Sequence, residues 1–496
     1  MAMSGVKQGL LNLLARVSAI LTQKNCQAYV VGGFVRDWLL GRETADIDIA
    51  VSGNALNIAQ EVAEAIGGRY VLLDEANRVA RVVLVGDEQP WHLDFSSFSS
   101  SIENDLERRD FTINAMAVEL QGLVSGSPRL IDSFGGEGDL KAGLVRAVSQ
   151  QVFEQDAARL LRAVRLAAEL GSKIEPGTES LIRQNCQLVR LVPGERLREE
   201  LLRLLALPGS VALVRYLDEV GLLTGIIPEL DGMKGVEQPK EHFWNVFDHS
   251  VETVATVEFL LRESQWEYGK KHLLAATPWS EEISRHFDEE VSSGSNRRML
   301  LKLAGLLHDI AKPATKTVDE TGKMRFLGHA KQGADMATGI LSRLRFSGRE
   351  IRLVEILIYH HLHPAQMSNE GLPTSRAIYR YFRDTEDAGI DVLFLALADY
   401  LATHGPRLDV EEWQQHNQMI NYVLTEHFNQ EAKVLPAKLI NGRDLMDIFG
   451  LSPGRLIGEL LAMVREAQAS GEVSSRDEAI ELVRKELNKQ CCGAAC

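Results

Sequence analysis

The chain has 496 residues, of which 45% are hydrophobic and 25% charged, and its formal net charge is −15. This composition is typical of a globular protein that buries a sizeable core without needing disulfides or structural metals to fold. The net negative charge argues against a uniformly basic nucleic-acid-binding surface, but it is compatible with a local basic region.

The sequence carries no signal for membrane insertion or for secretion. No uncharged run approaches the roughly 20 apolar residues of a membrane-spanning helix, and Arg16 interrupts the apolar stretch near the N-terminus. The five cysteines form no regular disulfide framework. We therefore expect a cytoplasmic protein without a membrane partner, and we interpret the cysteines near the C-terminus as a frayed end rather than a metal site.

Short segments rich in β-branched residues dominate the first 148 residues. The pattern predicts a helix over 55–66 and strands over 27–31, 46–51, 69–73, 78–85 and 91–95. After Phe153 the apolar period becomes three to four residues, which predicts helices. The polar stretch 266–297 is weakly periodic, and we interpret it as a mobile loop or an insertion.

A Gly-Gly turn follows the first expected strand and leads into a helix. Gly32 and Gly33 allow backbone N–H groups to approach a phosphate, and Arg36 follows one helical turn later. Taken alone, such a turn is more often only a tight connection between a strand and a helix.

Two carboxylates follow on the next expected strand. Asp46 and Asp48 are two residues apart, so their side chains share one face of the strand. Like charges this close repel unless a cation neutralises them, and Mg²⁺ prefers carboxylates that lie near phosphates. Asp94, on a later strand, is a candidate third carboxylate. Next to the glycine turn, these residues predict a nucleotidyl-transfer site.

Charged residues recur at every third position at the start of the helical region, namely Asp156, Arg159, Arg162 and Arg165. We expect this spacing to place them on one helical face. A carboxylate accepts from the amino group of cytosine or adenine, and a guanidinium beside it donates to the adjacent ring nitrogen. Uracil and guanine present the reverse pattern of donors and acceptors, so the same pair would reject them. The alternative is an ordinary solvated arginine stripe.

These motifs together resemble those of class II tRNA nucleotidyltransferases and bacterial poly(A) polymerases, which belong to the DNA polymerase β-like superfamily. The similarity includes 107–117, 131–140 and 153–165 and extends more loosely to 439–446 and 453–458. It implies that Mg²⁺ binds Asp46 and Asp48 and that Asp94 assists in catalysis. The nucleotide-binding residues that it implies are Gly32, Gly33, Arg36, Arg109, Asp110, Asn114, Asp156, Arg159, Arg162 and Arg165.

Two departures from the family pattern accompany this resemblance. Gln155 replaces the usual glutamate before Asp156, and Ala157 replaces the common proline after it. The Gly-Arg-Arg-Phe signature of bacterial poly(A) polymerases is also missing, because the corresponding stretch begins Gly67-Gly-Arg-Tyr. The absence of this signature favours addition to tRNA over poly(A) synthesis.

Histidines cluster in the second half of the chain. Their order resembles that of the HD metal-dependent phosphohydrolase superfamily, with an adjacent His-Asp pair and a late aspartate. The resemblance implies a two-metal site in which either or both of two adjacent histidines take part; Mg²⁺, Mn²⁺, Ni²⁺ and Fe²⁺ suit such donors. A decayed domain is the alternative. The implied ligands are His249, His308, Asp309, His329, His360, His361 and Asp399.

The resemblances together imply an α+β fold in which a polymerase β-like nucleotidyltransferase head precedes helical domains. We expect the head, a mixed sheet with helices, at 1–148 and an all-α neck at 149–230. An HD-type helical domain is expected at 231–410, and a helical tRNA-binding region at 411–496. The segment 155–215 carries ten basic and seven acidic residues, so we expect tRNA along the neck.

The sequence therefore predicts a template-independent nucleotidyltransferase that adds CCA, or part of it, to tRNA 3′ ends from CTP and ATP. The 3′-hydroxyl attacks the nucleotide's α-phosphate, and the HD domain supplies a phosphohydrolase activity. One alternative is a bacterial poly(A) polymerase. The other is an HD phosphohydrolase with a degenerate transferase head. The sequence leaves the nucleotides added, the HD metal and the oligomeric state open.

Overall fold

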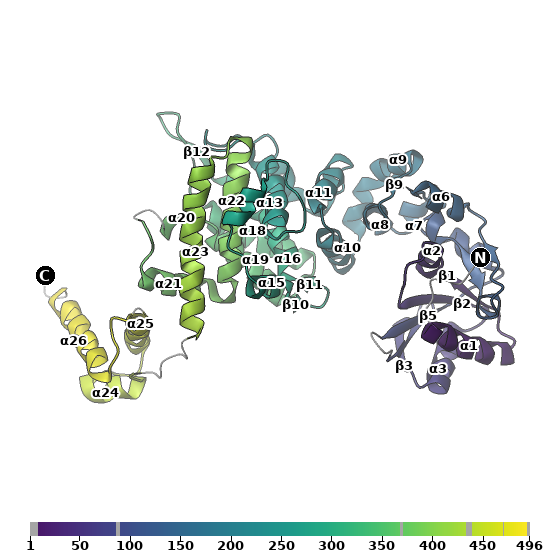
Figure 1. Ribbon diagram of the computed structural model, residues 1–496, viewed down its shortest axis with the longest axis horizontal. Coiled ribbons are helices and arrows are strands. Elements are labelled where there is room, and N and C mark those ends of the chain that lie inside the picture. The colour runs from purple at the N-terminus through teal and green to yellow at the C-terminus, as the bar shows by residue number, and fades with distance from the viewer. Residues whose placement is uncertain (1–7, 86–89, 368–370, 433–438, 470, 494–496) are drawn as a thin grey trace. The chain divides into compact units, whose positions relative to one another are not determined.

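The computed structural model describes residues 8–85, 90–367, 371–432, 439–469 and 471–493 (Figure 1). The chain divides into two compact units. The first comprises Met1–Glu200 and Tyr216–Ile226, and the second comprises Leu201–Arg215 and Ile227–Cys496.

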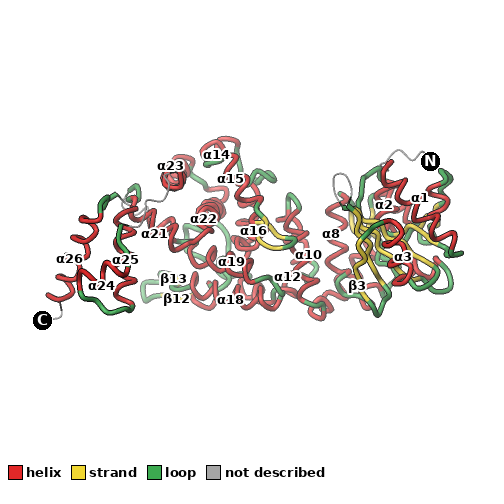
Figure 2. The backbone as a smooth tube through the Cα atoms, turned by 90° about the horizontal axis from the view of Figure 1, so that it is seen from below, coloured by secondary structure: helices red, strands yellow, loops and turns green. Residues whose placement is uncertain are grey.

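A seven-stranded mixed sheet forms the centre of the first unit (Figure 2). The strand order is β3-β4-β5-β2-β1-β6-β7. Only β2 and β5 run parallel, and the other neighbouring strands of this sheet are antiparallel. The strands are β1 Ala28–Val31, β2 Asp46–Val51, β3 Arg69–Asp74, β4 Val79–Leu84, β5 Trp91–Ser97, β6 Ala117–Glu119 and β7 Leu130–Ile131.

Two helices, α1 (Gln8–Gln23) and α3 (Ala55–Ile66), contribute apolar side chains to the same core as the sheet. The amide side chain of Asn54 caps α3 by accepting hydrogen bonds from the N–H groups of residues 56 and 57. Gly67 ends the helix in the left-handed conformation, with φ of 74°. The expected head, a mixed sheet with helices, is confirmed, and α3 has the expected bounds.

The helices that follow the sheet in this unit are short and amphipathic. They include α7 (Val152–Gln155), α8 (Arg159–Leu170), α9 (Pro176–Asn185) and the first half of α10 (Gly194–Ala206). Leucine, valine and alanine side chains cover the buried face of α8. The expected helical region after the head is therefore present.

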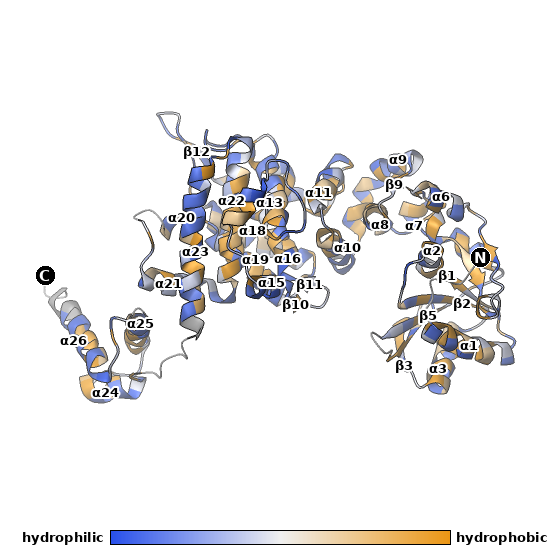
Figure 3. Cartoon of the chain, in the orientation of Figure 1, coloured by the Kyte–Doolittle hydropathy of each residue, from blue (hydrophilic) through white to orange (hydrophobic). Residues whose placement is uncertain are grey.

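The second unit is built mainly from helices that pack side by side. Its centre consists of α13 (Val246–Leu260), α16 (Arg297–Leu307), α18 (His329–Arg343), α19 (Gly348–His360) and α22 (Gly389–His404). Figure 3 shows that these helices carry both apolar and polar residues. Within the described ranges, no helix has the length and apolarity needed to cross a membrane.

The stretch 266–297, expected to be a mobile loop or an insertion, is ordered, so the loop interpretation is wrong. It contains the helices α14 (Lys271–Ala276) and α15 (Glu281–Asp288) and a short hairpin. Its apolar residues follow no regular period, which weakens the helical signal, yet Leu273 and Phe287 are almost fully buried. Burial of these anchors orders the segment.

The C-terminal helices form a further small core. They are α24 (Gly442–Phe449), α25 (Arg455–Ala469) and α26 (Arg476–Gly493), preceded by the long α23 (Val410–Ala432). The side chains of the C-terminal cysteines lie outside the described residues, so the interpretation of that end stays a prediction.

Candidate functional site

Three neighbouring strands of the first unit bring polar side chains to one face of the sheet. The parallel register of β2 and β5 places Asp46 opposite His92 and Asp48 opposite Asp94. The antiparallel register of β4 and β5 places Arg81 opposite Asp94. Because side chains two residues apart share a face, the three predicted carboxylates lie on the same side of the sheet.

Two of these carboxylates have protein partners. His92 Nδ1 lies 2.8 Å from Asp46 Oδ1. Arg81 donates from Nε and Nη2 to the two oxygens of Asp94, both at 2.7 Å. In the described part of the chain, no hydrogen-bond donor contacts the carboxylate of Asp48, and burial raises its pKa while Arg109 opposes that shift. A half-buried carboxylate without a described donor fits a cation, which would stabilise its charged form.

Gly32 lies directly beside this carboxylate. Its φ is 73°, and a Cβ there would lie 2.6 Å from Arg109 Nη1 and 2.7 Å from Asp48 Oδ2. Only glycine fits, because both the backbone conformation and the space exclude a side chain. The absence of a side chain at Gly32 therefore lets the Asp48 carboxylate and the Arg109 guanidinium lie close against the backbone of the turn.

A chain of contacts connects four of the other predicted nucleotide-binding residues. Arg36 donates to Asn114 Oδ1 at 2.8 Å, and Asn114 donates to Asp110 Oδ1 at 3.1 Å. The second oxygen of Asp110 lies 3.0 Å from Arg162 Nε. The structure thus brings together residues that are up to 126 positions apart in the sequence.

Asp156 is held by an arginine that the sequence patterns do not single out. Arg196, on α10, donates from Nη1 and Nη2 to the two Asp156 oxygens, both at 2.8 Å. Burial opposes ionisation of Asp156, but these hydrogen bonds lower its pKa overall. Arg196 stands in a run of charged and apolar residues whose period indicates only a helix, so no local signal identifies it.

Arg159 is anchored mainly by the backbone. It donates to the carbonyl oxygens of Arg108 at 2.7 Å and Val152 at 3.3 Å, and to the amide oxygen of Gln155 at 3.4 Å. The departure at position 155 therefore supplies a neutral oxygen where a glutamate would supply a charge. The guanidinium of Arg159 stays close to Asp156, with 4.0 Å between Nε and Oδ2.

The expectation that all four charged residues share one helical face is wrong for two of them. Asp156 lies between α7 and α8, outside both helices, in an extended conformation with φ of −153°. The other exception is Arg165. This side chain is buried and bound to Glu200 at 2.6 Å and Glu169 at 2.7 Å. An α-helix turns by about 100° per residue, so each step of three falls about 60° short of a full turn and the face drifts. Arg165 therefore belongs to an internal ion-pair cluster and not to the predicted nucleotide-binding face.

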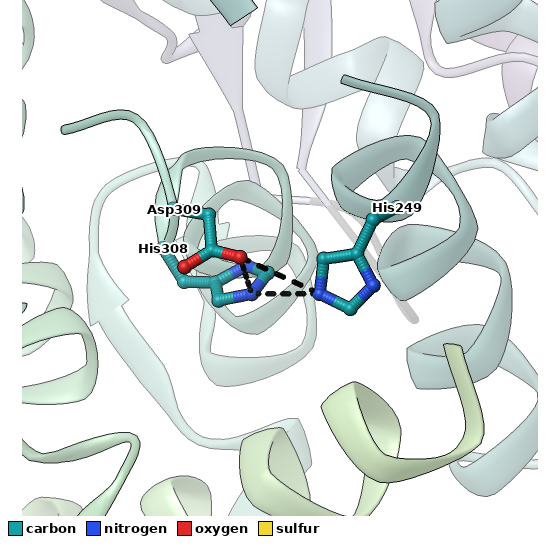
Figure 4. Close-up of side chains that lie close together, drawn as sticks. All are labelled: His249, His308 and Asp309. Atoms are coloured by element: carbon teal, nitrogen blue, oxygen red, sulfur yellow. Dashed lines mark hydrogen bonds and ion pairs between the residues drawn. The ribbon is translucent and has the colours of Figure 1, made fainter. Parts of the chain in front are cut away.

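A second centre lies among the helices of the second unit (Figure 4). His249 comes from α13, His308 and Asp309 directly follow α16, and Asp399 lies on α22. His249 Nε2 is 3.2 Å from His308 Nε2 and 3.0 Å from Asp399 Oδ1, and His308 Nε2 is 3.2 Å from Asp309 Oδ2. Two Nε2 atoms that face each other at this distance are placed as potential ligands of one ion.

The other side of Asp309 faces a second pair of histidines. His329 Nε2 lies 3.5 Å from Asp309 Oδ1 and 3.3 Å from His361 Nε2. Asp309 thus belongs to two groups of potential ligands, one with His249 and His308 and one with His329 and His361. This shared carboxylate fits a two-metal centre.

Backbone carbonyl oxygens orient three of these imidazoles. The Nδ1 atoms of His308, His329 and His361 lie 2.6 to 2.8 Å from carbonyl oxygens. Since a carbonyl only accepts, Nδ1 carries the hydrogen, so each ring in its neutral form presents the lone pair of Nε2 to a metal. Burial lowers the pKa of His361 to about 4, which keeps it neutral near pH 7. The donor set therefore fits divalent cations.

His360 lies outside this cluster, so its assignment as a ligand is corrected. Its ring stacks on that of His363 and meets Tyr359 edge-on, and His361 occupies the predicted position instead. Adjacent residues at the end of a helix point in different directions, and the sequence cannot distinguish them.

A cavity of about 750 Å³ opens beside the second centre and is lined in part by Asp309, His329, His361 and Asp399. Its wall also contains Lys312, whose Nζ lies 2.6 Å from Asp309 Oδ2. The sequence patterns did not identify this lysine, although it belongs to the same motif as His308. The cavity is large enough for a small phosphate ester.

Four family models match the chain. Their descriptions are Poly A polymerase head domain, residues 28–146; Probable RNA and SrmB-binding site of polymerase A, residues 171–233; HD domain, residues 246–404; and tRNA nucleotidyltransferase domain 2 putative, residues 326–483. The first covers the carboxylate face of the sheet, and the third covers the histidine cluster.

Two curated relatives align along almost the whole chain. The A-adding tRNA nucleotidyltransferase of Deinococcus radiodurans is 33% identical over 92% of this chain and 95% of its own length. The CC-adding tRNA nucleotidyltransferase of Thermus thermophilus is 32% identical over 91% of this chain and 92% of its own length. Among solved structures, a CCA-adding enzyme with CTP is 25% identical with a TM-score of 0.64, covering 98% of this chain and 96% of that one.

Proposed function

The chain belongs to the tRNA nucleotidyltransferase family, and from this membership we propose that it adds part of the CCA sequence, either CC or the final A, to tRNA 3′ ends. The substrates are tRNA with CTP or ATP, and the compartment is the cytoplasm. Two relatives that align along more than nine-tenths of the chain are named for partial addition, which supports this choice.

The observation that carries the proposal is the carboxylate face of the sheet beside Gly32. Asp46 and Asp48 would hold Mg²⁺, with Asp94 next to them on β5. A bound divalent cation promotes ionisation of the attacking 3′-hydroxyl and stabilises charge on the leaving pyrophosphate. The glycine turn, Arg36 and Arg109 bind the triphosphate, and their positive charge draws the anionic substrate to the site.

The remaining residues place the sugar and the base. Asp110 and Asn114 orient the ribose, and Arg162 supports them through its contact with Asp110. Asp156 and Arg159 select cytosine or adenine through their hydrogen-bonding edges, because uracil and guanine present the opposite pattern. Selection by fixed side chains needs no nucleic-acid template.

For the second centre we propose hydrolysis of phosphate esters with one or two divalent cations held by the histidine cluster, Asp309 and Asp399. The metal is Mg²⁺, Mn²⁺, Ni²⁺ or Fe²⁺, since imidazole and carboxylate donors suit all four. A bound cation supplies an activated water and polarises the phosphate. Lys312 would bind the phosphate on the cavity wall, where its ammonium faces Asp309.

Transcripts ending at the discriminator base, at C or at CC test the proposal. Each is offered CTP, ATP or both with Mg²⁺, and product lengths are read on a sequencing gel. We expect either CC addition that then stops, or A addition restricted to the CC end. Complete CCA synthesis contradicts partial addition. Long A tracts on unstructured RNA establish a poly(A) polymerase, and phosphatase activity without any addition establishes the HD phosphohydrolase.

A further inference from the structure

His92 occupies a distinctive position in the first unit. It is the only histidine in the first 241 residues of the sequence. The parallel register places it opposite Asp46, and its Nδ1 lies 2.8 Å from Asp46 Oδ1. The Asp46 side chain is 71% exposed, whereas that of His92 is only 29% exposed, so the ring is the more firmly packed partner.

His92 contacts Oδ1 of Asp46 and does not contact Oδ2. No described donor contacts Oδ2, which leaves this oxygen for a cation. An exposed carboxylate at the start of a strand rotates freely unless another group holds it. A hydrogen bond to the first oxygen fixes the plane of the carboxylate and so the direction in which the second one points.

Asp94, two residues from His92 on β5, shows the same arrangement with a different donor. Arg81 holds both of its oxygens. Polar groups behind metal-ligating carboxylates orient them, and their removal typically lowers metal affinity about 10- to 100-fold. Asp46 and Asp94 thus each have a separate side chain that contacts the carboxylate, His92 for the first and Arg81 for the second.

We propose that His92 is a positioning residue that orients Asp46 for divalent-cation binding by donating a hydrogen bond from Nδ1. The proposal rests on the function proposed above, in which Asp46 is a metal ligand. It extends the site to a residue that neither the motifs nor the resemblance identifies.

Three substitutions separate this role from packing. His92→Asn places an amide nitrogen at the position of Nδ1, whereas His92→Gln places it at the position of Nε2, and His92→Ala removes the donor. Ser96→Ala is the matched control, because residue 96 lies on the same strand and the same face. Thermal melting checks that each variant is folded.

The first readout is Mn²⁺ binding measured by electron paramagnetic resonance without tRNA or nucleotide. Asp46→Ala identifies the part of the binding that belongs to this site, since the second centre contributes equally to every variant. We expect His92→Gln and His92→Ala to weaken that part about 10- to 100-fold. His92→Asn and Ser96→Ala should stay close to the parent protein.

The second readout is nucleotide addition as a function of Mg²⁺ concentration. The Gln and Ala variants should need more Mg²⁺ for half-maximal rate and recover most activity at saturation. Unchanged Mn²⁺ binding in these two, or an equal defect in the Asn variant, overturns the inference. If Asp46→Ala keeps parent-level Mn²⁺ binding and addition, the proposed site itself is wrong, which is a different outcome.

Discussion

At Gly32, the absence of a side chain lets Asp48 and Arg109 approach the turn of the proposed nucleotide site. The positive φ and the closeness of Asp48 and Arg109 both act at this one residue. We expect Gly32→Ala to lower kcat/KM for addition by at least about 100-fold, because small displacements of reacting groups have effects of that size.

Gly41→Ala is the matched control for this prediction. Gly41 also has a positive φ, 69°, but a Cβ there meets no atom within 4 Å. The two variants share the backbone strain of about 1 kcal/mol, which thermal melting measures, and differ only in the clash. Comparable activity in both would mean that the close approach of Asp48 and Arg109 to the turn is not needed for nucleotide addition.

Arg196 is the second residue at this scale whose role can be measured. Its two hydrogen bonds fix the plane of Asp156. We expect Arg196→Ala to raise KM for the accepted nucleotide about 10-fold or more, since charge-assisted hydrogen bonds contribute about 1.5–3 kcal/mol. Misincorporation of UTP and GTP should rise, which single-nucleotide addition assays measure.

Arg196→Lys and Arg183→Ala accompany that measurement. Lysine keeps the charge but cannot hold both oxygens, so we expect an intermediate effect. Arg183 also lies on a helix after the head and pairs with Glu179, away from Asp156. If Arg183→Ala changes base selection as much as Arg196→Ala, the effect is general charge loss and not the orientation of Asp156.

At the level of elements, alternation and the 3.6-residue period were sufficient to predict strands β1 to β5 and helix α3. These patterns were insufficient where the same spacing is compatible with two different placements of a side chain. A spacing of three suggested a shared face for Arg165, but the helical drift takes it into the interior. Arg196 was not predictable, because its partner lies 40 residues earlier and only the tertiary fold brings the two together.

The packing of α23 on α22 contains a pH-sensitive contact. His416 stacks on Tyr400 with ring centroids 4.6 Å apart. Burial lowers the pKa of His416 to about 4 from its usual 6.5, while the unfolded chain binds a proton near 6.5. The unfolded state therefore holds more protons between these values, so stability falls as the pH decreases through this range.

We expect the free energy of unfolding to fall less at acidic pH in His416→Phe, because phenylalanine keeps an aromatic ring and removes the titrating group. Urea unfolding from pH 7 to pH 4 should show a shallower decline for the variant, by at most about 3 kcal/mol. His272→Gln, at an exposed position on α14, is the control and should keep the parent slope. Parallel curves for the parent and the phenylalanine variant would contradict the assignment.

At the scale of the whole molecule, the two centres lie in different compact units. The sheet with Asp48 belongs to the first unit, and the cluster around Asp309 belongs to the second. Each site is completed by side chains of its own unit, so neither needs the other for its geometry. We therefore expect the two activities to be separable by single substitutions.

Asp48→Ala should abolish nucleotide addition and retain hydrolysis of a phosphate ester such as p-nitrophenyl phosphate, since the histidine cluster is untouched. Asp309→Ala should do the reverse, because Asp309 is shared by both groups of potential ligands in the second centre. EDTA should stop both reactions, and different divalent cations should restore each. A variant that loses both activities while melting like the parent would show that the two centres depend on each other.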